Sequence, residues 1–323
     1  MTTESRLHVV AGVVARGGQV FLARRPAHLH QGGLLEFPGG KLESGESAHA
    51  ALKRELQEEI GITANTLEPL IRIPHDYSDK QVLLDVWRVA DWSGEPHGKE
   101  GQQAGWFRFD ELHADLFPAA NVSILTALRL PESYLISPEP CAENHYGLRM
   151  LHQTLKAGVR LVQLRSKRLD ADALRPRVIQ YAALGKSYGA RLLVNTHVDL
   201  VPGTGADGVH LTSKQLFAFD KRPLPSRFLV SASCHDAQEL ERAVAIGADF
   251  VTLSPVTPTD SHPDVEAMGW KRFAELVDAC PIPVYALGGV ARSELSEARQ
   301  RGAQGVAGIT RLAKDYGGGY PPM

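Results

Sequence analysis

The sequence lacks the features that mark membrane, secreted and nucleic-acid-binding proteins. No apolar run approaches the roughly 18 residues of a membrane-spanning helix, so we expect no membrane partner. The N-terminal stretch MTTESRLHVVAGVV has no basic segment followed by an apolar one, the pattern of a secretory leader. Lys and Arg total 35 against 37 Asp and Glu, which excludes the basic field that long nucleic acid requires. These absences predict a soluble, cytoplasmic protein.

Cysteine is scarce as well. Cys141, Cys234 and Cys280 are scattered and form no Cys-x-x-Cys pair, so we expect buried or partly buried thiols of a reducing compartment rather than a disulfide framework. The 323 residues, 43% of them hydrophobic, suffice for two domains or one large one.

The most distinctive feature of the sequence is an acidic stretch between Gly40 and Ile62. Glu55, Glu58 and Glu59 stand at i, i+3 and i+4, so a helix places all three carboxylates on one face. Repulsion between these carboxylates destabilises an isolated helix by a few tenths of a kcal/mol per pair. A bound divalent cation would remove this destabilisation. Mg²⁺ and Mn²⁺ prefer carboxylate oxygens and keep waters that they share with substrate phosphates. The alternative is a solvated helix face.

The residues around this cluster form a fixed pattern. Gly39 and Gly40 permit the tight loop that a phosphate or metal site needs, and Gly61 stands where a helix ends. The fixed positions are Gly40, Glu46, Arg54, Glu55, Leu56, Glu58, Glu59, Gly61 and Ile62. They match the signature of the Nudix hydrolases, and the chain resembles that family.

The resemblance implies roles for these residues in cation-dependent hydrolysis of a phosphate chain, with Mg²⁺ or Mn²⁺ as cofactor. The residues implied in metal binding or water activation are Glu55, Glu58, Glu59 and Glu100, with Gly40 offering its backbone carbonyl to the metal. Arg54 is expected to orient Glu55 through a charge-assisted hydrogen bond. Which carboxylate acts as the general base stays open.

Residues 7–130 resemble more closely the MutT subgroup of that family, the 8-oxo-dGTP diphosphatases. The shared stretches lie at residues 21–25, 35–41, 94–102 and 117–121. They imply a nucleoside triphosphate substrate, with Arg25, Phe37, Lys80 and Asn121 as substrate-binding residues. Asn121 would hydrogen-bond the oxidised purine, since its amide both donates and accepts; a helix N-cap is the alternative. Lys80 replaces an arginine of the bacterial prototype and cannot make its planar two-pronged contact.

The periodicity of the chain predicts two domains, residues 1–131 and 132–323, joined at a proline-marked boundary at 130–133. The first has strand-like runs at 7–14, 19–24, 66–75, 81–90 and 105–109. The second alternates eight expected strands with helices, which favours a compact (β/α)₈ TIM barrel. The strands are expected at 134–137, 160–165, 191–195, 207–211, 228–233, 249–254, 283–287 and 305–309. For the first domain the resemblance implies a Nudix α/β/α sandwich with a mixed sheet.

Functional residues of such barrels follow the strands. Those expected to contact a barrel ligand are Arg165, Lys167, Asn195, His210, His235, Gly288, Gly289 and Thr310. The glycine-rich groups after the last two strands predict phosphate binding by backbone N–H groups; a tight turn is the alternative for Gly288-Gly289. A structural role is the alternative for either histidine.

The barrel sequence resembles thiamine phosphate synthase and its relative TenI, a thiazole tautomerase, at residues 207–211, 254–259, 286–290 and 305–307. The synthases carry metal-binding aspartates where this chain has Thr196 and Gln215. They also carry a lysine that is replaced in this chain at a position near His262. Without those carboxylates we expect no Mg²⁺ site for a diphosphate leaving group, and so no synthase activity. A phosphorylated thiazole or pyrimidine ligand, a tautomerase activity and a partner surface remain open.

Taken together, the sequence predicts a Mg²⁺-dependent hydrolase that converts 8-oxo-dGTP to 8-oxo-dGMP and pyrophosphate, a reaction of nucleotide-pool sanitation and DNA repair. One rival is hydrolysis of a thiamine-pathway diphosphate. Another makes the barrel a sensor of thiazole phosphate that controls the Nudix half. A homodimer is compatible with the sequence.

Overall fold

The computed structural model describes residues 6–26, 31–77, 80–139, 146–259 and 265–318. The chain divides into two compact units, residues 1–128 and 129–323. No helix within the described ranges is long and apolar enough to cross a membrane. Cys234 and Cys280 are buried free thiols, as predicted, and Cys141 lies outside the described residues.

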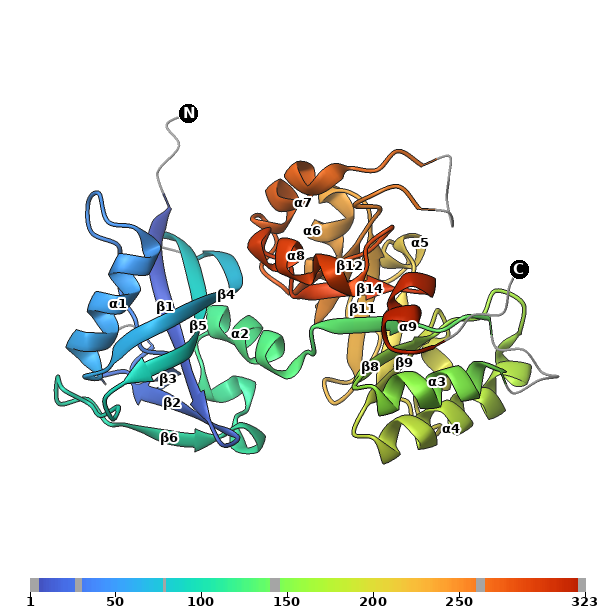
Figure 1. Cartoon of the computed structure of the whole chain (residues 1–323), viewed down its shortest axis with the longest axis horizontal. Coiled ribbons are helices and arrows are strands. Elements are labelled where there is room, and N and C mark those ends of the chain that lie inside the picture. Colours follow the sequence, from blue (N-terminus) through green and yellow to red (C-terminus); the bar gives the residue numbers. More distant parts are fainter. Residues whose placement is uncertain (1–5, 27–30, 78–79, 140–145, 260–264, 319–323) are drawn as a thin grey trace. The chain divides into compact units, whose positions relative to one another are not determined.

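The first unit is a mixed sheet with a helix on each face (Figure 1). The strands follow the order β3, β2, β1, β5, β4, and β6 pairs with β2. β1 and β5 are parallel, and the other neighbours are antiparallel. The bounds are β1 Leu7–Arg16, β2 Gln19–Arg24, β3 Leu35–Glu36, β4 Thr63–Asp76, β5 Gln81–Ser93 and β6 Ala104–Arg108.

Successive residues of β1 point to opposite faces of the sheet, and both faces are buried. Val10 lies in the same buried cluster as Leu56 of α1 (Ala48–Glu59), whereas Val13 lies in that of Ile124 of α2 (Ala119–Arg129). Gly12 lies beneath α1, where an added Cβ would come within 3.1 Å of Leu56 Cδ2. The predicted α/β/α sandwich is confirmed.

A gap between β1 and β2 creates room for the glycine loop. The two strands pair only beside their hairpin, and the loop 38–42 runs along the free edge of β1. The amides of Val10 and Gly12 donate to the carbonyls of Gly40 and Pro38, each at 2.8 Å. Gly39 has φ +152°, and a Cβ there would lie 2.1 Å from the Val10 carbonyl oxygen. Only glycine fits, and the loop is fixed beside α1.

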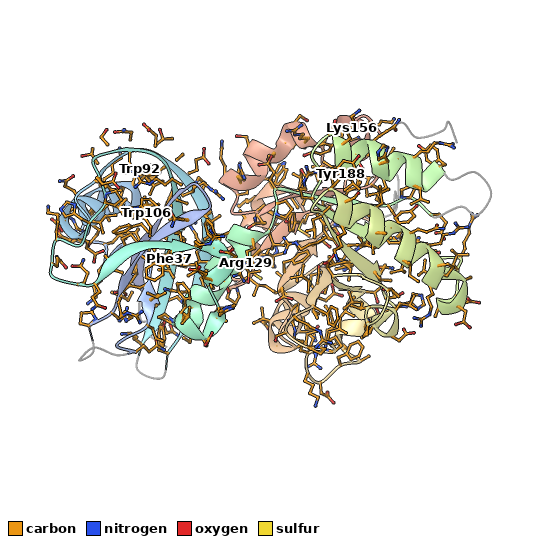
Figure 2. The ribbon with its side chains drawn as sticks, turned by 90° about the horizontal axis from the view of Figure 1, so that it is seen from below. Phe37, Trp92, Trp106, Arg129, Lys156 and Tyr188 are labelled. Carbon is orange, nitrogen blue, oxygen red and sulfur yellow. The ribbon has the colours of Figure 1, made fainter. Side chains whose placement is uncertain are left out.

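The second unit is a closed barrel of eight parallel strands in chain order, which confirms the predicted TIM barrel. Figure 1 shows α3 and α4 side by side next to β8 and β9. Tyr188, labelled in Figure 2, follows α4, and its hydroxyl lies 2.8 Å from His152 Nε2 of α3. The strands are β7 Ser133–Ile136, β8 Leu161–Leu164, β9 Arg191–Asn195, β10 Gly208–Leu211, β11 Leu229–Cys234, β12 Phe250–Leu253, β13 Val284–Ala286 and β14 Gly305–Gly308. The helices are α3 Tyr146–Lys156, α4 Ala171–Ser187, α5 Ser213–Leu216, α6 Ala237–Ala245, α7 Gly269–Val277, α8 Leu295–Gln300 and α9 Thr310–Asp315.

Residues 129–132 close the N-terminal end of the barrel interior. Leu130 is 6% exposed and lies in a buried cluster with residues of six barrel strands, namely Tyr134, Leu161, Leu193, Phe250, Tyr285 and Ala307. Gln304 Nε2 donates to the Leu130 carbonyl at 3.0 Å, and the Tyr285 hydroxyl donates to the Pro131 carbonyl. The domain boundary after residue 131 stays a prediction. Because Leu130 and Pro131 contact the barrel, fragments that begin before and after these residues test it.

We predict that a fragment of residues 129–323 is more stable than one of residues 132–323. The shorter fragment lacks the buried Leu130 side chain, worth about 2–3 kcal/mol, and carbonyl partners worth about 1 kcal/mol each. Urea unfolding followed by fluorescence measures both midpoints, and Leu130→Ala in the longer fragment should reproduce part of the loss. Equal midpoints would contradict the role given to this segment.

Candidate active site

Helix α1 carries the acidic cluster and has well-defined ends. It begins after Ser47, whose Oγ accepts a hydrogen bond from the Ala50 amide at 3.2 Å. It ends before Gly61, whose φ of +72° is the left-handed conformation that terminates helices. The helix is thus set so that Glu55 and Glu59, one turn apart, both face the glycine loop. A Cβ on Gly40 would lie 2.3 Å from the Glu55 carboxylate.

Glu59 is the most perturbed carboxylate of the site. Its Oε2 accepts a hydrogen bond from the Gly39 amide at 2.9 Å. Burial raises the pKa of Glu59 to about 7, and repulsion from Glu55, Glu36 and Glu100 adds to the rise, while the Gly39 bond opposes it. The site therefore concentrates more negative charge around Glu59 than the protein itself neutralises.

Arg54 binds the other carboxylates of the cluster. Its Nε and Nη2 donate to the two oxygens of Glu46 at 3.1 and 3.0 Å, and its Nη1 donates to Glu55 at 2.8 Å and to Glu58 at 3.2 Å. These bonds raise the pKa of Arg54 and lower that of Glu46. The expected hydrogen bond from Arg54 to Glu55 is present. The Glu58 side chain is 55% exposed, against 15% for Glu55, so the carboxylates differ in depth.

Glu100 comes from the loop between β5 and β6, which is fastened to the last turn of α1. The Lys99 amide donates to the Glu59 carbonyl at 2.9 Å, and Lys99 Nζ donates to the Gln57 carbonyl at 2.9 Å. An α-helix leaves the carbonyls of its last turn without intrahelical partners, and this loop supplies them. Glu100 itself is exposed, but its charge contributes to the raised pKa of Glu59.

The expected substrate-binding residues lie on other elements. Arg25 forms an ion pair with Glu36 of β3, whose pKa is raised by burial and held down in part by Arg25. Phe37, labelled among the strands of the first unit in Figure 2, stacks on Phe117 with ring centroids 5.8 Å apart. Lys80 places its ammonium 5.8 Å from the centre of the Tyr77 ring.

Asn121 lies on α2. The N-cap alternative for this residue is wrong, because α2 begins at Ala119 and Asn121 is its third residue. Its amide donates to the Pro118 carbonyl at 2.9 Å, as a residue of the first helical turn does. Its role toward a purine stays a prediction.

The donor set around Glu59 fits a hard divalent cation in its chemistry: carboxylates that exceed the local positive charge, and a glycine carbonyl. The Gly40 carbonyl accepts from the Val10 amide and keeps a second lone pair. Within the described ranges no three Asp, Glu, His or Cys side chains are gathered closely enough to hold a metal ion. Since Arg54 binds Glu55 and Glu58, a cation at Glu59 would compete with Arg54 for the Glu55 carboxylate.

The barrel holds a buried polar network around His210, which is 2% exposed. Its Nδ1 lies 3.0 Å from Ser231 Oγ and 3.2 Å from the Tyr134 hydroxyl, and its Nε2 lies 2.8 Å from Ser233 Oγ. Burial, reinforced by the charge of Arg165, lowers the pKa of His210 to about 3, so the ring is neutral at pH 7.

The other expected barrel residues follow neighbouring strands. Asn195, which ends β9, is 9% exposed, whereas Arg165 is half-buried and Lys167 exposed after β8. The Glu139 carboxylate accepts from the Lys167 amide at 2.8 Å and joins the loops after β7 and β8. His235 is exposed, with Nδ1 2.8 Å from a Glu239 oxygen.

Two glycines after β13 adopt left-handed conformations. Gly288 and Gly289 have φ of +95° and +68°, and a Cβ on Gly289 would lie 2.2 Å from Thr257 Oγ1. β13 pairs with β14, and Thr310 begins α9 two residues after β14 ends at Gly308. The two groups therefore follow adjacent strands, as the phosphate-binding prediction requires.

The positions that would need carboxylates for a metal lie next to each other. Gln215 Nε2 donates to the Thr196 carbonyl at 2.9 Å, and Gln215 also forms a capping box with Thr212 at the start of α5. A neutral amide bonded to a carbonyl does not fit Mg²⁺, which takes carboxylate oxygens. The third expected departure, near His262, lies outside the described residues.

The first unit thus holds an acidic helix against a glycine loop on a two-sided mixed sheet, and the second unit is a closed parallel barrel. Residues 133–312 match the family model described as thiamine monophosphate synthase, and residues 9–127 match that of the NUDIX domain. The chain belongs to both families, one through each unit. It is therefore a hydrolase of phosphoric anhydride bonds.

Relatives match each of the two units over four fifths or more of their own length. The 8-oxo-dGTP diphosphatase of Escherichia coli is 39% identical over 125 residues, which are 38% of this chain and 97% of that protein. A candidate thiamine-phosphate synthase of Aquifex aeolicus is 37% identical over 183 residues, 57% of this chain and 98% of that protein. The thiamine-phosphate synthase of Caldicellulosiruptor saccharolyticus is 31% identical over 184 residues, 55% of this chain and 82% of that protein.

Sequence reasoning missed Glu36, Gln102 and Glu139. Glu36 had a usable signal, since a charged residue within the apolar run Leu34–Phe37 needs a partner. Gln102 ends the shared stretch 94–102, which marks its position but not its contact with Glu59. Glu139 had no signal, because its contact joins segments that only the fold brings together.

We predict that Glu59→Gln stabilises the metal-free protein at pH 8 but not at pH 4. The folded pKa of about 7 exceeds the ordinary 4.5, so the stability linked to protonated Glu59 is present below pH 4.5 and is lost as pH rises through 7. The expected gain at pH 8 is on the order of 3 kcal/mol, seen as a higher thermal midpoint. A variant-to-wild-type difference that is the same at both pH values would contradict the burial of this charge.

Proposed function

We propose that the first unit hydrolyses nucleoside triphosphates, and 8-oxo-dGTP preferentially, to the monophosphate and pyrophosphate. The observation that carries this proposal is the buried Glu59 carboxylate beside Gly39, with Glu55 and Glu100 around it and Arg54 saturated by other carboxylates. The 39% identity to the Escherichia coli 8-oxo-dGTP diphosphatase, over almost all of that protein, supports the choice of substrate.

Nudix hydrolases generally require a divalent cation, and we propose Mg²⁺, with Mn²⁺ as its substitute. The residues that would hold it are Glu55, Glu58, Glu59 and Glu100, with the Gly40 carbonyl. A bound cation supplies neutralisation of the charge that develops on the phosphate chain, and activation of water. Arg54 keeps Glu55 oriented toward the glycine loop, and one carboxylate of the set takes the proton of the attacking water.

The substrate itself would be held by residues outside α1. Arg25 would bind the phosphate chain, with its guanidinium oriented by Glu36. Phe37 and Asn121 would receive the purine, Phe37 by apolar contact and Asn121 through its amide. Lys80 would lie at the base end of the site.

We predict that Glu58→Gln and Glu59→Gln each lower kcat by about 10²–10³-fold with the fold retained, because each removes a negative charge that would hold the cation beside the phosphate chain. Pyrophosphate release from 8-oxo-dGTP with saturating Mg²⁺ measures the loss. Glu43→Gln is the matched control, an exposed carboxylate before the helix, and should keep wild-type turnover. Near wild-type turnover in both helix variants would contradict the site.

We predict that Asn121→Ala lowers kcat/KM for 8-oxo-dGTP more than for dGTP. Removing one hydrogen-bonding partner of a substrate edge costs roughly 1–3 kcal/mol, or about 5- to 150-fold. Competition between the two nucleotides in one reaction gives the ratio directly. An equal loss on both would assign Asn121 to the helix alone.

For the barrel we propose a phosphorylated thiazole or pyrimidine as ligand, without synthesis of thiamine phosphate. The contact between Gln215 and Thr196 supports the absence of synthesis, because it fills the metal position with neutral groups. Phosphate capture by the backbone N–H groups around Gly289 and Thr310 needs no metal.

We predict that residues 1–131 alone hydrolyse 8-oxo-dGTP and that the full chain does not join a pyrimidine diphosphate to thiazole phosphate. Product analysis by chromatography measures both, with an active thiamine phosphate synthase as the positive control. Thiamine phosphate formed by the full chain would contradict the barrel assignment. An inactive but folded 1–131 fragment would mean that the barrel contributes to hydrolysis.

One experiment distinguishes the two alternative functions, hydrolysis of a thiamine-pathway diphosphate and control of the Nudix half by a barrel that senses thiazole phosphate. Rates on 8-oxo-dGTP, dGTP and a pyrimidine diphosphate are compared with and without thiazole phosphate. Preference for the pyrimidine diphosphate would favour a thiamine-pathway hydrolase, and a rate that responds to thiazole phosphate would favour a sensor.

A further inference from the structure

Gln102 bridges the backbones of two acidic residues that reach the site from distant parts of the chain. Its Oε1 accepts a hydrogen bond from the Glu100 amide at 2.9 Å, and its Nε2 donates to the Glu59 carbonyl at 3.2 Å. One end of the amide must accept and the other must donate, so only this orientation satisfies both partners. A single side chain therefore sets the spacing between the two backbones.

At one end, the Gln102 side chain is bonded to helix α1. The Glu59 carbonyl lies in the last turn of α1 and also accepts from the Lys99 amide at 2.9 Å. Beyond Lys99 the chain turns through Gly101, whose φ is +79°, and this turn brings Gln102 back over Glu100. Gln102 is half-buried, whereas Glu100 is exposed, so Gln102 is the better anchored of the two.

We propose that Gln102 is a positioning residue that holds Glu100 beside Glu59, so that the loop carboxylate is in place before cation and substrate bind. The consequence for turnover rests on the proposed nucleotide hydrolysis. The bridge itself is a property of the protein alone and is tested without nucleotide. Holding Glu100 in place beforehand matters because a carboxylate that is not held loses conformational entropy each time a ligand binds.

The first test is amide hydrogen exchange of the full-length, metal-free protein by NMR. Gln102→Met keeps the length of the side chain but forms neither hydrogen bond, and Gln103→Met changes the adjacent, exposed glutamine. We expect the Glu100 amide to exchange about tenfold faster in Gln102→Met and at the wild-type rate in Gln103→Met. The Lys99 amide, bonded to Glu59 independently of Gln102, should keep its protection, which separates local release from loss of the whole loop.

The second test asks whether the released loop matters to the site. Mn²⁺ binding without nucleotide, followed by electron paramagnetic resonance, should weaken about tenfold in Gln102→Met. The kcat for 8-oxo-dGTP should fall by a similar factor while KM changes less than about twofold. In a Glu100→Gln background the Gln102→Met change should have little further effect on Mn²⁺ binding, since residues acting through one group are non-additive.

An unchanged exchange rate at Glu100 in Gln102→Met would overturn the proposal. So would additive effects of the two substitutions on Mn²⁺ binding, because Gln102 would then act through another group. If the wild-type protein hydrolyses no nucleoside triphosphate, the proposed function fails, while the exchange and Mn²⁺ results still decide the role of Gln102.

Discussion

The site of the first unit depends on one electrostatic constraint, the negative charge around Glu59. In the part of the chain that the structure describes, no cationic side chain pairs with this carboxylate, because Arg54 is bound to Glu46, Glu55 and Glu58. A hydrogen bond from Gly39 offsets only part of the cost, and the pKa of Glu59 rises to about 7. A fold that keeps a buried carboxylate without a cationic partner needs a bound cation to neutralise its charge when the site functions.

Backbone contacts, rather than the reacting side chains, hold this arrangement. The glycine loop is bonded to the free edge of β1, and the loop that carries Glu100 is bonded to the end of α1. The barrel follows a different principle. Its central histidine is neutral among hydroxyl groups, and Gln215 donates to the Thr196 carbonyl at the two positions where a metal-dependent synthase is expected to carry carboxylates. One chain thus joins a charge-dense acidic site to a barrel whose buried histidine is surrounded by hydroxyl groups.

The barrel was predicted from hydrophobic periodicity and glycine positions, which determine strands, helices and their ends with little tertiary information, whereas the sandwich of the first unit was predicted from the family resemblance. The sequence also predicted the acidic helix, since the spacing of Glu55 and Glu59 is local. It did not predict that Glu58 turns to solvent and Arg54 while Glu59 is buried, because depth depends on packing against the glycine loop. The placement of Asn121 inside α2 was likewise open, since Pro118 starts the helix earlier than the apolar run suggests. Gln102 and the closure of the barrel by Leu130 join remote segments, which a single sequence does not reveal.

We propose that the first unit cleaves a nucleoside triphosphate between the α- and β-phosphates with a cation held at Glu59. The most direct measurement is product analysis of 8-oxo-dGTP incubated with the full-length protein and Mg²⁺, by anion-exchange chromatography. We expect 8-oxo-dGMP and pyrophosphate in equal amounts, and a higher kcat/KM for 8-oxo-dGTP than for dGTP. Release of orthophosphate, or no turnover of any nucleoside triphosphate, would contradict it.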